Sequence, residues 1–168
     1  MKNIFTSGKQ KGFTLIELLI VITIIATLAV TVFVALDPAK RLKDAKDSRR
    51  TSDVDSILTA IHQFIVDNKG SFPSNMPASG GSEVQLGNGS SACTISTGGC
   101  SATVATVCAD LLTGATNLTK YLKSMPIDPS GGTTYVASKS GYTVTLDSNN
   151  IVTIKACGAE NTTISSSR

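Results

Sequence analysis

One long apolar run dominates the N-terminal part of the chain. Nineteen residues without a charge extend from Leu18 to Leu36, and Phe13 to Ile16 lengthen the run to 24 residues, interrupted only by Glu17. A helix rises about 1.5 Å per residue, so this run can span the roughly 30 Å hydrocarbon core of a bilayer. Its Ile, Val and Thr residues would also suit a strand, but only a helix satisfies its own backbone in lipid. We therefore predict a transmembrane helix, because the apolar region of a secretory signal peptide is shorter.

Beyond this run, the pattern becomes that of an amphipathic helix. Pro38 removes one helical hydrogen bond, which predicts a kink. Pairs of opposite charge then follow at i, i+4 spacing, as on a solvated helix face: Asp37/Arg41, Lys40/Asp44, Lys43/Asp47 and Arg49/Asp53. An apolar stripe follows at Val54, Ile57, Leu58, Ile61, Phe64 and Ile65. Gly70 is a natural terminator, so residues 13–69 are predicted to form one long helix, kinked at Pro38.

The remaining chain predicts a small sheet. Residues 70–107 are rich in Gly, Ser, Thr and Pro and predict loops, whereas residues 108–122 predict a short helix. From residue 134 the hydrophobic period becomes two, which predicts strands at 134–136, 141–146 and 151–156. The expected fold is α+β: a long N-terminal helix, with a transmembrane half and an amphipathic half, packed on a small C-terminal antiparallel β-sheet.

The charge of the chain is unevenly distributed. The 168 residues carry a formal net charge of +3, and Lys2, Lys9 and Lys11 lie in the first eleven residues. Without these three lysines, basic and acidic residues are equal in number, so the charge gives no indication of nucleic-acid binding. A near-neutral surface suits a subunit that packs against copies of itself. The sequence contains no recognisable nucleophile elbow, carboxylate pair or phosphate-binding loop, and we expect neither an enzyme nor a bound cofactor.

Four cysteines lie in the C-terminal part: Cys93, Cys100, Cys108 and Cys157. An even number in a small Gly- and Ser-rich region predicts two disulfides and an oxidising compartment. Three pairings are open. We favour Cys93–Cys100, which closes a short loop, and Cys108–Cys157, which ties the middle of the domain to its end. Zinc binding is disfavoured because the spacings differ from those of zinc sites and the one histidine is remote.

A motif at the start of the apolar run points to a known family. Residues 9–21 have the sequence KQKGFTLIELLIV: a basic leader, Gly12, Phe13, and an acidic residue, Glu17, at a fixed place in the apolar segment. This segment resembles the prepilin cleavage and methylation motif of type IV pilins and type II secretion pseudopilins. All positions of that pattern are present.

The resemblance implies a processing and assembly pathway. A prepilin peptidase would cut between Gly12 and Phe13 at the cytoplasmic face of the membrane and N-methylate the new amine of Phe13. A membrane assembly platform with a cytoplasmic ATPase would then add the subunit to a homopolymer that also contains related pilin subunits. The expected segments are a leader peptide at 1–12, a transmembrane and assembly helix at 13–36, its amphipathic continuation at 37–69, and a globular head at 70–168.

Glu17 is an acidic residue within the predicted membrane span. A charged side chain at the centre of a membrane helix costs roughly 2.5–3.5 kcal/mol on insertion scales, and such residues usually have a functional partner. The resemblance implies that Glu17 pairs with the Phe13 amine of a neighbouring subunit during assembly. The alternative is that Glu17 lies near the membrane interface and pairs with its own terminus.

The expected location is a single pass through the cytoplasmic membrane, with the leader inside and the head outside. After assembly the subunit would lie in an extracellular pilus or a periplasmic pseudopilus. One feature opposes this orientation: six basic residues lie between Lys40 and Arg50, against three in the leader, and positive charge usually marks the cytoplasmic side. The motif and the cysteines agree with each other, and we follow them.

A second stretch, at residues 125–132, resembles the Pro-x-Asp-Pro-x-Gly segment of major secretion pseudopilins, in which the following loop can hold calcium. Asp128 is the calcium candidate here. Calcium takes six to eight oxygen ligands, and Asp147 is the one other carboxylate nearby, so we favour a turn-capping role for Asp128.

Three functions remain open at this stage. The first, which we favour, is a structural subunit of a type IV pilus serving adhesion, motility or DNA uptake. The second is a pseudopilin that drives protein export in a type II secretion system. The third is a membrane-anchored binding protein that does not polymerise.

Overall fold

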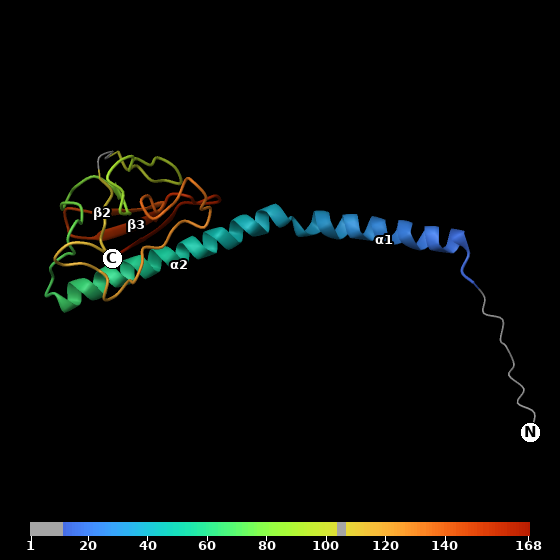
Figure 1. Cartoon of the computed structure of the whole chain (residues 1–168), viewed down its shortest axis with the longest axis horizontal. Coiled ribbons are helices and arrows are strands. Elements are labelled where there is room, and N and C mark those ends of the chain that lie inside the picture. The colour runs from blue at the N-terminus through green and yellow to red at the C-terminus, as the bar shows by residue number, and fades with distance from the viewer. Residues whose placement is uncertain (1–11, 104–106) are drawn as a thin grey trace, which may run out of the picture. The chain divides into compact units, whose positions relative to one another are not determined.

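Two helices form the N-terminal part of the protein in a computed structural model that describes residues 12–103 and 107–168 (Figure 1). Helix α1 spans Leu15–Leu36 and helix α2 spans Pro38–Asp67. The chain divides into two units, Met1–Arg41 and Leu42–Arg168. The head, as we call the second unit, contains most of α2 and the whole sheet.

The break between the helices lies at Asp37. This residue has left-handed backbone angles, φ 37° and ψ 71°, and ends α1. Its side chain accepts a hydrogen bond from the Lys40 amide (3.3 Å), as an N-cap does, and its carbonyl oxygen accepts one from the Arg41 amide (3.2 Å). Pro38 is the first residue of α2, where a proline costs no hydrogen bond. The predicted single helix at 13–69 thus begins later, at Leu15, and is interrupted at Asp37.

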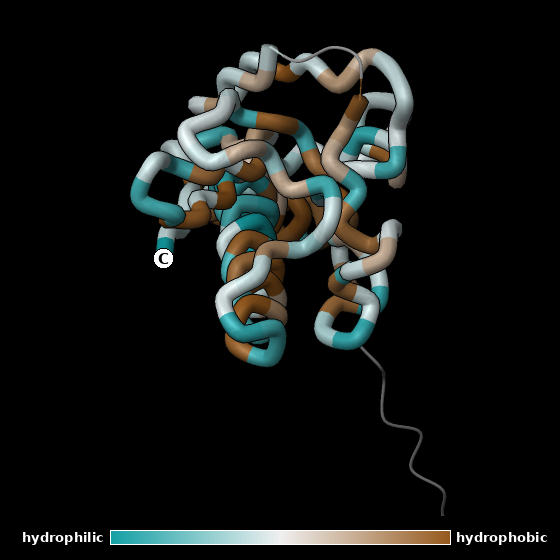
Figure 2. The backbone as a smooth tube through the Cα atoms, turned by 90° about the vertical axis from the view of Figure 1, so that its left-hand side faces the viewer, coloured by the Kyte–Doolittle hydropathy of each residue, from teal (hydrophilic) through white to brown (hydrophobic). Residues whose placement is uncertain are grey.

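The apolar stripe on α2 packs against the sheet, as predicted. Val54, Ile57, Leu58, Ile61 and Phe64 are buried in one core cluster, and Ile65 is partly buried beside it. Figure 2 shows that the turns of α2 carry both hydrophobic and hydrophilic residues, as a helix with one buried face requires. The helix ends where expected. The Gly70 amide donates a hydrogen bond to the Ile65 carbonyl oxygen (2.8 Å), and Gly70 has φ 90°, as a residue just past a helix end often does.

The sheet has four antiparallel strands in the order β1-β2-β3-β4: β1 at Val84–Gln85, β2 at Tyr142–Leu146, β3 at Val152–Ala156 and β4 at Ile164–Ser167. Strands β2 and β3 confirm two predicted strands. The prediction of a strand at 134–136 is wrong, because this segment makes only an isolated bridge between Val136 and Lys139. The prediction of a helix at 108–122 is also wrong, since the described part of this segment forms turns. Strands β1 and β4 were not predicted.

The two faces of the sheet differ in chemistry. One face is apolar and joins the core with the stripe of α2; it carries Tyr142, Val144, Leu146, Val152, Ile154 and Ala156. The other face carries polar residues of the alternate positions, and Gln85 pairs with Thr143 there. Figure 1 shows the strands running beside α2. Because a loop at residues 93–103 covers the polar face, the head has three layers: helix, sheet and loop.

The favoured disulfide pairing is wrong, although all four cysteines are oxidised. Cys93 bonds with Cys108 and Cys100 bonds with Cys157. The reason is a small hairpin in which Ile95 and Ala102 exchange both backbone hydrogen bonds (3.0 and 2.9 Å). Cys100 lies near the turn of this hairpin and Cys93 at its base, so each pairs with a segment outside the hairpin and neither pairs with the other.

Candidate processing and assembly site

The predicted cleavage bond lies just before the first helix. Thr14 is the N-cap of α1 and has extended backbone angles, φ −80° and ψ 152°. Phe13 is 91% exposed, and a side-chain carbon added to Gly12 would meet no atom within 4 Å. Nothing in the described chain therefore requires glycine at this position. Exposed, irregular backbone is the usual substrate of proteases, and the Gly12–Phe13 bond has that form.

A capping box fixes the first turn of α1. The Glu17 amide donates to Thr14 Oγ1 (3.3 Å), and Glu17 Oε2 accepts from the Thr14 amide (2.8 Å) and from Thr14 Oγ1 (2.9 Å). This reciprocal arrangement satisfies helix amides that otherwise lack partners, and a carboxylate is stabilised at the positive end of the helix dipole. The pattern Thr-x-x-Glu before an apolar run is the sequence signature of this capping box.

Glu17 thus has a role that the sequence analysis did not assign to it. Both hydrogen bonds from Thr14 go to Oε2. Within the described residues, Oε1 accepts no hydrogen bond, so one oxygen of the carboxylate is free for a further donor.

The surface of α1 is apolar on all sides. None of its residues is buried in the structure, and its large apolar side chains are about half exposed or more. The hydroxyl groups of Thr23, Thr27 and Thr31 donate to carbonyl oxygens three or four residues earlier, at 2.8–2.9 Å. The hydroxyl groups of these three threonines are therefore satisfied within the helix. Among the described residues, this is the one helix with the length and composition to cross a membrane.

A buried charge cluster lies in the head, where α2 meets the loops that precede and follow the β2–β3 hairpin. Arg50 is 0% exposed and donates twice to Asp128, from Nε to Oδ2 (2.7 Å) and from Nη2 to Oδ1 (2.8 Å). It also donates to Asp47 Oδ1 and Ser130 Oγ, both at 2.7 Å. The hydrogen bonds and charge of Asp128 raise the pKa of Arg50 above its ordinary value. The prediction of a solvated charged face is therefore wrong at Arg50.

Asp128 is not available as the calcium ligand that we considered. Both of its oxygens accept hydrogen bonds from Arg50, and Oδ1 also accepts from the Ser130 amide (2.8 Å). The last contact is the turn-capping role that the sequence favoured. Within the described ranges, no cluster of three His, Cys, Asp or Glu residues is arranged to hold a metal ion.

Asp47 ties the segment after β3 to helix α2. Its carboxylate accepts from the backbone amides of Glu160 (3.2 Å) and Asn161 (3.1 Å), and from Arg50. Asp44 accepts from Asn161 Nδ2 (3.0 Å). Burial acts to raise the pKa of Asp47, but the hydrogen bonds from Arg50, Glu160 and Asn161 outweigh it and lower the pKa. Of the predicted i, i+4 pairs, the structure contains Arg49–Asp53, at 3.8 Å.

Comparison with known proteins agrees with the sequence motif. An α+β head that follows a long apolar N-terminal helix is a pilin-like fold. Residues 7–33 match the family model of the prokaryotic N-terminal methylation motif, so the chain carries the leader signature of type IV pilins and pseudopilins. No curated protein and no solved structure matches the chain.

Proposed function

We propose that this protein is a structural subunit of a type IV pilus-like fibre, made as a precursor and polymerised from the membrane. The observation that carries the proposal is the methylation motif at residues 7–33, which lies over the start of an apolar helix without buried residues. Such a helix needs a cover of lipid or of other chains, because exposed apolar surface is unfavourable in water. A subunit that passes from membrane to fibre meets this need in both states.

Processing is the first step of the proposed mechanism. A prepilin peptidase removes residues 1–12, and the cut between Gly12 and Phe13 exposes an amine two residues before Leu15, the first residue of α1. N-methylation of Phe13 keeps the positive charge of this amine. The charge then lies beside an anionic residue of the capping box, at a helix end that on its own disfavours cations.

Pairing between subunits is the second step. Lipid tails are as apolar as the side chains of α1, so exchanging lipid for neighbouring helices gives little hydrophobic free energy. A polar pair that forms only between subunits makes the exchange from membrane to fibre favourable. The free Oε1 of Glu17 accepts from the Phe13 amine of a neighbour, while Oε2 keeps the capping box with Thr14 intact. The oxygen of Glu17 that the capping box leaves free gains a charged donor in the fibre, which favours the assembled state.

The proposed pathway also gives the location of each part of the chain. The leader stays in the cytoplasm, α1 crosses the inner membrane once, and the head lies outside, where its two disulfides are stable. Assembly uses a membrane platform with a cytoplasmic ATPase. The sequence feature that favoured a type II secretion pseudopilin was the segment around Asp128. Because Asp128 binds Arg50, the calcium-loop part of that resemblance has no support in the head. We propose a surface pilus and keep the secretion pseudopilus as the alternative.

The Glu17→Gln variant tests the proposal. Glutamine keeps the length of the side chain but loses the charge, so we expect a processed chain that does not assemble. The measurement is the mass of the N-terminal peptide and the amount of protein in sheared surface material, from cells that contain a prepilin peptidase. Asp55→Asn, which removes an exposed carboxylate of α2, is the matched control and should assemble normally.

Three outcomes separate the alternatives. Wild-type chains that begin at methylated Phe13 in the sheared fraction support a pilus. The same mature chains found in membranes alone would instead indicate a short pseudopilus in protein export. Chains that retain residues 1–12 would contradict both and leave the membrane-anchored binding protein.

A further inference from the structure

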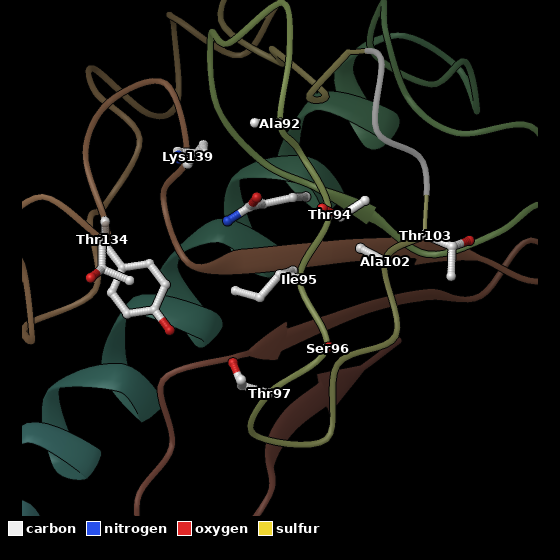
Figure 3. A pocket seen from close by; sticks show the side chains of 11 residues that line it. Ala92, Thr94, Ile95, Ser96, Thr97, Ala102, Thr103, Thr134 and Lys139 are labelled. Atoms are coloured by element: carbon white, nitrogen blue, oxygen red, sulfur yellow. The ribbon is translucent and has the colours of Figure 1, made fainter.

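A hollow in the head lies between two loops on the polar side of the sheet. Its volume is about 580 Å³, within the range of roughly 300–1,000 Å³ that is common for small-molecule sites. Figure 3 shows Thr94, Ser96 and Thr97 of the hairpin on one side and Thr134 and Lys139 on the other. Neither the processing motif nor helix α1 contributes to it, so the proposed polymerisation leaves this hollow unexplained.

One wall of the hollow is the hairpin of Ile95 and Ala102, and covalent and polar contacts hold it in place. Disulfides Cys93–Cys108 and Cys100–Cys157 fix it at its base and near its turn. Thr97 Oγ1 donates to the Cys157 carbonyl oxygen (2.9 Å). At the turn, Gly98 has φ 57° and its Cα lies so close to the Cys157 backbone that no side chain fits. The wall is therefore ordered before any ligand arrives, which lowers the entropy cost of binding.

The opposite wall is anchored to the segment after β1. Val136 and Lys139 exchange both backbone hydrogen bonds (3.0 and 2.8 Å), which makes a tight turn before Lys139. The Gly89 amide donates to the Ser138 carbonyl oxygen (3.0 Å), holding this turn in place. Between the walls, Gln85 is 2% exposed. The orientation of its side-chain amide that pairs both polar atoms lets the nitrogen donate to the Cys93 carbonyl oxygen (3.2 Å) and the oxygen accept from the Gly141 amide (3.3 Å). Gln85 thus joins the two walls.

Ala92, Ile95 and Ala102 give the hollow an apolar part, and several of the polar groups beside them make no hydrogen bond with the protein. Within the described residues, the hydroxyl groups of Thr94, Ser96 and Thr134 make no hydrogen bond with the protein, and neither does the Tyr135 hydroxyl group. Lys139 has no ion pair there and is the one charged residue of the lining. Two carboxylates of adjoining segments are engaged elsewhere, Glu83 by Lys155 (3.0 Å) and Asp128 by Arg50.

This lining selects for a particular class of ligand. Hydroxyl groups both donate and accept, so a lining of threonine, serine and tyrosine complements a molecule that carries many hydroxyl groups. The single ammonium group, with no carboxylate among the described residues of the lining, favours a negative charge on that molecule. An aromatic ring supplies an apolar surface for the ring carbons of a ligand, and the lining contains one, Tyr135, whose ring lies close to Gly141.

We propose that this hollow binds an acidic sugar of a carbohydrate chain. The Lys139 ammonium group pairs with the sugar carboxylate, the hydroxyl groups of Thr94, Ser96 and Thr134 exchange hydrogen bonds with the sugar hydroxyls, and Tyr135 packs on the ring carbons. The site belongs to the head alone and does not depend on polymerisation.

Calorimetric titration of the full chain, dispersed in detergent, tests this site. The ligands are trigalacturonate, an acidic trisaccharide, and maltotriose, a neutral one of the same length. We expect saturable binding of trigalacturonate, at least about tenfold tighter than that of maltotriose, because only the acidic sugar offers a charge-assisted hydrogen bond to Lys139. Raising the salt concentration should weaken the binding of trigalacturonate and leave the binding of maltotriose unchanged.

Two lysine variants make the test specific. Lys139→Gln should remove the preference for the acidic sugar, whereas Lys123→Gln, which changes an exposed lysine outside the hollow, should bind as the wild type does. Intact disulfides and an unchanged melting curve show that each variant is folded. Equal binding of both trisaccharides by the wild type, no binding of either, or wild-type preference in Lys139→Gln would overturn the proposal. None of these outcomes bears on fibre assembly, which is measured separately.

Discussion

At the scale of single residues, Arg50 connects more parts of the head than its place in a charged run suggests. Its guanidinium group joins α2 to Asp128, Ser130 and Asp47, and Asp47 in turn holds the amides of Glu160 and Asn161. Removing two charges from water is costly, and the geometry here offsets that cost by two parallel hydrogen bonds to one carboxylate. The cluster therefore fixes which loops lie on α2.

Breaking the Arg50–Asp128 pair from one side should be strongly destabilising. We expect Asp128→Ala to lower the free energy of unfolding by about 3–5 kcal/mol, because the buried cation loses the carboxylate that binds it twice and keeps only its pair with Asp47. The double variant Arg50→Met/Asp128→Leu should recover much of that loss. Urea unfolding followed by circular dichroism measures both. Arg49→Ala breaks the more exposed pair with Asp53 and leaves the hydrogen bond from the Tyr142 hydroxyl group to Asp53 in place, so it should cost about 1 kcal/mol or less. An equal cost in Asp128→Ala and Arg49→Ala would contradict the assignment.

Asp47 should make the stability of the head depend on acid. Its pKa in the folded state lies below the ordinary value of 3.8, so the unfolded state binds protons more readily and acid favours unfolding. The contribution of Asp47 is complete above the unfolded pKa, near about 4, and is lost as the pH falls through the lower folded pKa. Unfolding measured from pH 6 to about pH 2 should therefore show a shallower acid dependence in Asp47→Asn than in the wild type. Asp55→Asn, on the exposed side of α2, should keep the wild-type slope.

At the scale of elements, the junction between α1 and α2 depends on two residues with separate functions. Asp37 takes the left-handed conformation and caps α2, while Pro38 starts α2 and cannot continue the hydrogen bonding of α1. A non-glycine residue in the left-handed region costs roughly 1–3 kcal/mol, so the interruption persists only while Pro38 excludes a continuous helix. We propose that the long helix changes its geometry at this junction as subunits pack.

Pro38→Ala should alter fibres through this junction. Alanine restores the missing amide and permits an unbroken helix from Leu15 to Asp67, so we expect fibres that are absent or that differ in rise and twist. Electron microscopy of sheared fibres provides the measurement. Asp37→Asn keeps a capping side chain that tolerates left-handed angles and should give normal fibres. Normal fibres from Pro38→Ala would show that the junction has no part in assembly.

At the scale of the whole molecule, folding and anchoring are separate tasks. Every described residue of the first unit is exposed, whereas the core cluster extends from Val54 to Ala156 and lies entirely in the head. Both disulfides also lie within the head. The contacts that stabilise the head thus lie within the head, and in the proposed function the first unit supplies the surface for the membrane and for assembly.

A chain that begins at Leu42 should therefore fold without α1. We expect it to be monomeric in size-exclusion chromatography without detergent and to melt within a few degrees of the full chain in detergent. A shorter chain that begins at Ser52 is the comparison; it lacks Asp47 and Arg50 and should melt at a clearly lower temperature. Aggregation or loss of folding in the longer fragment would show that α1 contributes to the core.

The sequence alone determined the features that rest on local periodicity and on one short motif. The apolar run, the stripe on α2, strands β2 and β3 and the end of the helix at Gly70 follow from spacings of two to four residues, which local chemistry controls. The motif at Gly12–Glu17 likewise needs no tertiary contact to be recognised. Strand β1 has two residues, and β4 is rich in serine. Neither therefore shows an alternation of hydrophobic and polar residues from which a strand could be predicted.

Tertiary structure decided which distant residues meet. The disulfide pairs depend on the register of the Ile95–Ala102 hairpin, and the burial of Arg50 depends on where the loop carrying Asp128 returns to α2. The i, i+4 rule predicted charge pairs along one helix and none of them included Arg50. Its partner Asp128 lies 78 residues away in the sequence, is buried with it and accepts two hydrogen bonds from it. Long-range pairings of this kind depend on the path of the whole chain, and local sequence patterns do not predict that path.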